Sequence, residues 1–187
     1  MSKKFVLITG CSGGGKSTLL SELSGRGYAT VSEPGRRIVA EELAGTGKAL
    51  PWVSMYEFAL RAVAMAQSDL LSAESERDFV FFDRGLVDAA VALQFAGGEP
   101  YLTTLDGIQH YIRPVFLAPP WSEIFSQDED RQHDFKSAME ESSRLENALV
   151  ELGYDVRTLP KVSLKERADL VLSELGIARP LYGGKMR

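Results

Sequence analysis

The chain has 187 residues, 44% of them hydrophobic, which suits one compact domain with a full core and leaves no room for a second catalytic module. Its formal net charge of -5 argues against broad nucleic-acid binding, because phosphate-backbone binders carry excess basic charge. A single cysteine excludes an intramolecular disulfide and a cysteine metal cluster. With no stretch long enough to span a membrane and no signal-peptide core, we expect one cytoplasmic domain over residues 1–187, without membrane or nucleic-acid partners.

The first predicted element is a strand near residues 4–9, which leads into the glycine-rich stretch GCSGGGKST. This stretch fits the spacing G-x-x-x-x-G-K-[ST], in which glycines let the backbone wrap so that N–H groups point at phosphate oxygens. Lys16 would reach the terminal phosphates, and the Ser17 hydroxyl would ligate Mg²⁺ at the positive end of a helix. The predicted nucleotide contacts are Gly10, Ser12, Gly13, Gly14, Gly15, Lys16, Ser17 and Thr18. The motif indicates a nucleoside triphosphate but not its use, because kinases, GTPases and mechanical ATPases share it.

Apolar runs of strand length alternate with longer amphipathic stretches along the rest of the chain. This alternation is typical of an α/β fold in which helices cover both faces of a parallel sheet. We predict further strands near residues 28–32, 78–83, 113–117 and 154–159. Helices are predicted for residues 52–74, 131–152 and 163–175.

Two of the predicted strands end in carboxylates, at the edge of the sheet where ligands bind in such folds. Glu33 follows the second strand, and Asp83 closes the third and precedes Arg84. Phosphoryl transfer to a hydroxyl needs one carboxylate to accept or orient the proton and another to hold Mg²⁺. We assign Asp83, with Ser17, to the metal and Glu33 to the acceptor, although the reverse assignment stays open. The alternatives are a helix-starting acid for Glu33, a turn residue for Asp83 and a structural ion pair for Arg84.

The segment 122–134, SEIFSQDEDRQHD, is polar and acidic and lies between two prolines and a predicted helix. Such a segment can move without disturbing the core, so we predict a lid. Arg131 is its one arginine. Closure over ATP would bring this guanidinium to the transferring phosphoryl group. Alternatively, Arg131 is an ordinary surface residue at the start of a helix.

Acceptor-binding residues are expected on the helices that follow Glu33. Arg36 and Arg37 could hold an acceptor phosphate, and Arg61 and Gln67 lie on the long helix that would border the acceptor pocket. For each of these four, the alternative is a solvated helix face.

The GCSGGGKST loop, Glu33-Pro34 and Asp83-Arg84 resemble the corresponding elements of P-loop nucleoside and nucleotide kinases. With Asp83-Arg84-Gly85 and Pro120-Trp121, the chain is most similar to the small AAA-like group that includes nicotinamide-riboside-kinase-type domains. The resemblance covers most of the chain and implies a P-loop three-layer sandwich, a five-stranded parallel sheet of order 2-3-1-4-5, ATP with Mg²⁺, and a mobile lid. Two departures are Gly85, where relatives often have Ser or Tyr, and a lid with a single arginine.

Three functions are therefore open. The favoured one is transfer of the γ-phosphate of ATP to a nucleoside- or nucleotide-like acceptor, with Lys16, Glu33, Asp83, Arg84 and Arg131 as catalytic residues. A regulatory ATPase or GTPase switch is the alternative, but the sequence contains no N-K-x-D or D-x-x-G motif. A module that merely anchors a nucleotide would not need two strand-end carboxylates.

Overall fold

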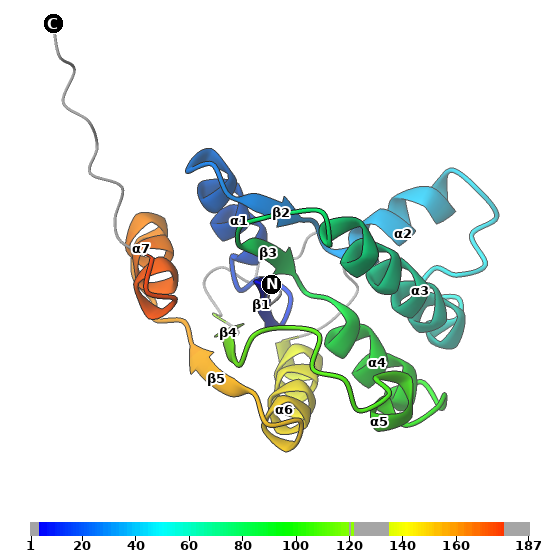
Figure 1. Ribbon diagram of the computed structural model, residues 1–187. Helices are drawn as coiled ribbons and strands as arrows, with labels where there is room; N and C mark the ends of the chain where they lie inside the picture. The colour runs from blue at the N-terminus through cyan, green and yellow to red at the C-terminus, as the bar shows by residue number, and fades with distance from the viewer. Residues whose placement is uncertain (1–3, 120, 122–134, 178–187) are drawn as a thin grey trace, which may run out of the picture.

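The computed structural model describes residues 4–119, 121 and 135–177, which form a central sheet between two layers of helices (Figure 1). The strands are β1 Phe5–Gly10, β2 Ala29–Val31, β3 Val80–Asp83, β4 Pro114–Ala118 and β5 Asp155–Thr158. The helices are α1 Lys16–Gly25, α2 Pro34–Leu43, α3 Met55–Ala73, α4 Leu86–Phe95, α5 Tyr101–Thr104, α6 Phe135–Glu151 and α7 Leu164–Glu174.

The five strands are parallel and lie in the order β2-β3-β1-β4-β5, as the resemblance implied. The central strand β1 has the sequence FVLITG and is buried along its whole length. Its neighbour β3 (VFFD) is likewise buried throughout, which is the pattern of strands covered on both faces. Because Ile8 pairs with Asp83 in the register of β1 and β3, the carboxyl end of β3 lies beside the end of β1, where the glycine-rich loop begins.

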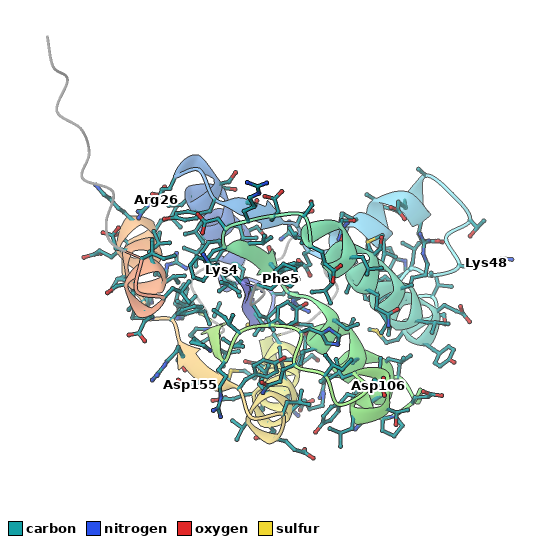
Figure 2. The ribbon with its side chains drawn as sticks, in the orientation of Figure 1. Lys4, Phe5, Arg26, Lys48, Asp106 and Asp155 are labelled. Carbon is teal, nitrogen blue, oxygen red and sulfur yellow. The ribbon has the colours of Figure 1, made fainter. Side chains whose placement is uncertain are left out.

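Alternate residues of the central strands face two separate cores. Phe5 and Phe82 pack on one face, with ring centroids 5.3 Å apart, in the cluster that α3, α4 and α6 cover. Phe81 faces the other way and packs with α1 and α7. Arg26, labelled in Figure 2, follows α1. Its Nη1 donates to Asp169 Oδ1 at 2.6 Å and joins the end of α1 to α7 on that second face.

The predicted strand and helix positions are confirmed to within a few residues, with three differences. Helix α3 begins at Met55 because the Ser54 hydroxyl accepts the Glu57 N–H at 3.3 Å and caps it. Helix α6 begins at Phe135, and the residues 131–134 that were predicted to open it lie outside the described part. Helices α4 and α5 were not predicted. In the described ranges, no helix is long and apolar enough to cross a membrane.

Candidate active site

The glycine-rich loop is shaped by its first glycine, at the end of β1. Gly10 has a φ of 117°, and a Cβ placed on it would lie 2.1 Å from the carbonyl oxygen of Ala118 at the end of β4. No other residue type avoids this collision, so Gly10 allows β4 to approach the loop closely. Gly15, at a φ of 70°, then turns the chain into α1.

Lys16 lies inside this loop and is 5% exposed. Its ammonium donates to the carbonyl oxygens of Gly10, at 3.0 Å, and Cys11, at 2.7 Å. Burial, reinforced by the positive charge of Arg84, lowers the pKa of Lys16, while Asp83 acts in the opposite direction. A cation in this position is ready to exchange backbone carbonyls for phosphate oxygens.

Ser17 and Asp83 form the contact that best fits a metal site. The Ser17 hydroxyl donates to Asp83 Oδ2 at 2.7 Å, and Asp83 is 2% exposed. Its second oxygen, Oδ1, is buried and accepts no hydrogen bond from any described residue. Burial raises the pKa of Asp83, and Lys16 partly offsets this effect. A divalent cation bound to Oδ1 and the Ser17 hydroxyl would compensate the buried charge, so these residues fit Mg²⁺.

The described residues contain no group of three or more His, Cys, Asp or Glu side chains that could hold a metal ion. This agrees with Mg²⁺ chemistry at a phosphate site, where one or two protein oxygens suffice because water and substrate phosphates complete the coordination.

Arg84 links the ends of β2 and β3 to α6. Its Nη1 donates to Glu141 Oε1 at 2.7 Å, and its Nε lies 3.6 Å from Glu33 Oε1. Burial tends to lower the pKa of Arg84, but the carboxylates of Glu141 and Glu33 outweigh it and raise that pKa. Glu33 is also 3.2 Å from Arg36 Nε. The structure thus brings together three of the predicted residues, Glu33, Arg36 and Arg84.

Buried hydrogen bonds of Asp88 and Tyr111 fix the backbone around Arg84, which has a φ of 57°. Asp88 Oδ2 accepts the Gly85 N–H at 3.1 Å, and Asp88 Oδ1 accepts the hydroxyl of Thr9 at the end of β1. The hydroxyl of Tyr111 accepts the Leu86 N–H at 2.9 Å. These bonds hold the start of α4 and the end of β1 in one arrangement.

The other predicted acceptor residues lie farther along α2 and α3. Arg37 pairs with Asp69 through both terminal nitrogens. Arg61 pairs with Glu41, at 2.5 Å, and with Glu42. Gln67 is exposed on α3. Arg131 and the predicted lid at residues 122–134 lie outside the described residues, so their roles stay predictions, as do those of Arg37, Arg61 and Gln67.

Sequence reasoning missed three side chains at the site: Glu141, Asp88 and Arg167. Arg167, in α7, reaches the loop, with Nη1 3.5 Å from the Gly14 carbonyl oxygen. No sequence motif marks these residues, because each contacts a group that is 50 or more positions away in the chain. These long-range contacts are Glu141 with Arg84, Asp88 with Thr9 and Arg167 with Gly14. Only Asp88 carried a signal, because it is the one charged residue in the apolar stretch LVDAAVALQF, where a charge needs a partner.

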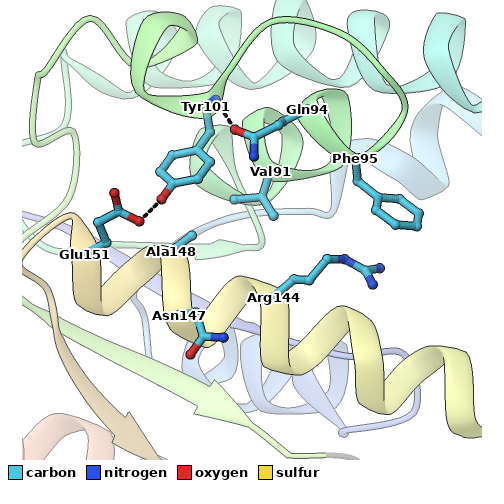
Figure 3. Close-up of a pocket in the computed structure, with 8 residues that line it drawn as sticks. All are labelled: Val91, Gln94, Phe95, Tyr101, Arg144, Asn147, Ala148 and Glu151. Atoms are coloured by element: carbon cyan, nitrogen blue, oxygen red, sulfur yellow. Dashed lines mark hydrogen bonds between the residues drawn. The ribbon is translucent and has the colours of Figure 1, made fainter.

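A separate pocket of about 260 Å³ lies between α4, α5 and α6 (Figure 3). Tyr101 donates its hydroxyl to Glu151 on one side of it, and the Arg144 guanidinium stacks on Phe95 at 3.8 Å on the other. None of the predicted site residues lines this pocket. It is therefore distinct from the site at the glycine-rich loop.

Comparison with known proteins gives a consistent picture. A family model described as an AAA domain matches residues 5–167, and no curated protein matches the chain significantly. A deoxyadenosine kinase from M. mycoides with bound dATP has a TM-score of 0.60 at 17% identity, over 92% of this chain and 99% of that one. Shikimate kinase from Acinetobacter baumannii in complex with shikimate has a TM-score of 0.58 at 16% identity, over 93% of both chains.

A NadR protein in complex with NR has a TM-score of 0.70 at 19% identity, over 97% of this chain and 54% of the other. At these identities the similarity concerns the fold, which is that of P-loop nucleoside and nucleotide kinases.

Proposed function

The chain belongs to the AAA-domain family, and from this premise we propose that it is a small-molecule kinase. The reaction transfers the γ-phosphate of ATP to a hydroxyl group of a nucleoside-like acceptor. The observation that carries the proposal is the pairing of buried Asp83 with Ser17 of the glycine-rich loop, beside a second carboxylate, Glu33, on the neighbouring strand end.

Each residue has a distinct part in this reaction. Lys16 and the backbone N–H groups of the loop bind the phosphate chain, and Asp83 and Ser17 would hold Mg²⁺. The bound ion would neutralise charge on the phosphates. The Glu33 carboxylate accepts the proton of the acceptor hydroxyl while the oxygen of that hydroxyl bonds to the γ-phosphorus and the bond between this phosphorus and ADP breaks. Arg84 orients Glu33 through their ion pair.

The charge around Glu33 favours an acceptor without a phosphate group. Arg36 lies against Glu33, and Arg37 is paired with Asp69, so both arginines predicted to hold an acceptor phosphate already have carboxylate partners. A phosphomonoester carries about -1.5 to -2 charge at neutral pH and would have to displace these carboxylates. We therefore favour a nucleoside or similar polyhydroxyl compound over a nucleotide.

The proposal is tested by measuring ATP consumption with a panel of nucleosides, their 5′-monophosphates, nicotinamide riboside, sugars and polyols. An unphosphorylated compound should raise consumption well above the acceptor-free rate, and its monophosphate should raise it less. Glu33→Gln should lower transfer by about 10²- to 10⁴-fold, the usual contribution of a general base, with ATP affinity unchanged. Glu99→Gln, which changes an exposed carboxylate in the loop between α4 and α5, is the control.

Two results would contradict the kinase assignment. One is a rate of ATP consumption that no compound raises, which would favour a switch or an anchoring module. The other is a Glu33→Gln protein that transfers phosphate normally, which would leave Glu33 as the acid that starts α2. A clear preference for monophosphates would overturn only the choice of acceptor class.

A further inference from the structure

Arg167 is a buried cation set against the glycine-rich loop. Arg167 lies in the first turns of α7 and is 6% exposed. Its Nη1 is 3.5 Å from the Gly14 carbonyl oxygen and 3.0 Å from the point where a Cβ of Gly15 would stand. The Thr18 hydroxyl lies 3.5 Å from the same point. The guanidinium therefore sits beside the turn at which the loop becomes α1.

No carboxylate in the described part of the chain pairs with Arg167, and its buried Nε makes no hydrogen bond there. Its remaining contact is the ring of Trp121, whose centroid is 4.8 Å from the guanidinium carbon. Arg26, at the same interface of α1 and α7, shows the usual arrangement, because it pairs with Glu22 and Asp169 at 2.8 and 2.6 Å.

A charge at this depth that has no counter-charge among the described residues is unfavourable. Burial lowers the pKa of Arg167, but arginine does not lose its proton in proteins, so the group stays charged. Buried charges normally have a counter-charge, and an aromatic face compensates a cation only in part. The missing counter-charge is expected where the guanidinium lies, at the loop and the positive end of α1, which are built to hold phosphate.

We propose that Arg167 binds the phosphate chain of the nucleotide held by the glycine-rich loop. The inference rests on nucleotide binding, which is part of the proposed function, and does not depend on transfer to an acceptor. The polyphosphate would supply the anion that the described residues do not. Trp121 covers the guanidinium and keeps it facing the loop.

The inference is tested with Arg167→Gln by calorimetric titration of ATP and of inorganic tripolyphosphate, together with urea unfolding in the absence of nucleotide. Loss of a charged hydrogen-bonding group should weaken the binding of both ligands by roughly tenfold to a hundredfold. The urea midpoint without nucleotide should stay the same or rise, because an unpaired buried charge is removed. Arg167→Lys should give intermediate affinity.

Arg26→Gln is the matched control, because it removes an arginine of the same interface that does have carboxylate partners. It should lower the urea midpoint and leave both affinities unchanged. If Arg167→Gln binds tripolyphosphate as tightly as the wild type does, the inference is overturned even if ATP binding weakens. Arg167 would then contact the nucleoside part of ATP and not its phosphate chain. An Arg167→Gln protein that loses stability as Arg26→Gln does but binds normally would show a structural role. If wild-type protein binds neither ligand, the proposed function fails as well.

Discussion

Asp83 is a carboxylate whose charge is unfavourable in the protein alone and useful in the complex. Burial raises its pKa, so its ionised form opposes folding, and stability falls as the pH rises through the folded-state value. The same burial leaves Oδ1 ready for a cation. Stability and metal binding therefore make opposite demands on this residue.

Asp83→Asn separates the two demands. The Mg²⁺ concentration for half-maximal activity should rise by about tenfold or more, because the charged ligand is lost. Thermal unfolding without nucleotide should occur at the same or a higher temperature, because the buried charge of Asp83 itself is removed. Activity against Mg²⁺ concentration and a melting curve measure both effects. An unchanged Mg²⁺ profile would move the metal role to Glu33.

Asp88 gives a prediction about pH. Burial raises its pKa to about 6, although Arg84, Thr9 and the Gly85 N–H act in the opposite direction. The folded protein therefore holds a proton that the unfolded chain releases between about pH 4 and pH 6, and stability is lost as the pH rises through 6. With a shift of about two pKa units, the loss is at most about 3 kcal/mol.

Asp88→Asn should remove this loss, because the amide can keep the contacts with Gly85 and Thr9 without a charge. Urea unfolding should give nearly equal free energies for variant and wild type at pH 4 and a more stable variant at pH 7. Comparing the variant with the wild type at the same pH removes the contribution of the other carboxylates to the difference in unfolding free energy. A difference between the two proteins that is the same at both pH values would show that Asp88 does not titrate in this range.

Sequence patterns identified the residues whose roles depend on local spacing. Lys16 and Ser17 followed from the loop motif, and Asp83 followed from its place after an apolar run. Glu141 and Arg167 could not be found in this way, because they reach the site through the packing of α6 and α7 on opposite faces of the sheet. Spacing along the chain carries no information about which helix lies against which strand end.

At the level of elements, the turn from β3 to α4 explains why glycine follows Arg84. A Cβ on Gly85 would lie 2.0 Å from the Tyr111 hydroxyl oxygen, which accepts the Leu86 N–H. The serine or tyrosine that the resemblance leads one to expect at this position would therefore collide with Tyr111. The departure from the family pattern is a local packing arrangement that fixes the start of α4.

Gly85→Ala should destabilise the protein by roughly 1–3 kcal/mol, as overpacking of a closed site does, and Tyr111→Phe should recover part of the loss. Gly25→Ala is the control, since a Cβ there meets no atom within 4 Å; it should be neutral or slightly stabilising. Urea unfolding of the single and double variants measures both. Additive effects of Gly85→Ala and Tyr111→Phe would contradict the collision.

Helices α4 and α5 were missed for physical reasons. Helix α4 has the sequence LVDAAVALQF and is buried on most sides, so it lacks the polar stripe that marks an amphipathic helix. Helix α5 has four residues, too few to show a period. The longer α3 and α7 were found because α3 has an apolar stripe and α7 begins with the Ser163–Glu166 capping box.

For the whole molecule, strand order decides what the site can do. Because β1 lies beside β3 and β3 beside β2, the ends of these three strands are neighbours. They place the glycine-rich loop, Asp83 and Glu33 next to one another at one edge of the sheet. Alternating strands and helices predicted a parallel sheet, but many strand orders share that pattern. The order 2-3-1-4-5 came from the family resemblance, whereas the expectation that both carboxylates lie at the ligand-binding edge came from their places at the ends of predicted strands.

The central claim is that the chain transfers phosphate to an acceptor hydroxyl and not to water. It is tested most directly with ATP labelled with ¹⁸O in the γ-phosphate, incubated with the best acceptor of the panel and analysed by mass spectrometry. A kinase should place labelled phosphate on the acceptor in an amount that matches the ADP formed and release little labelled inorganic phosphate. Labelled inorganic phosphate that accounts for all the ADP, at a rate independent of the acceptor, would contradict it.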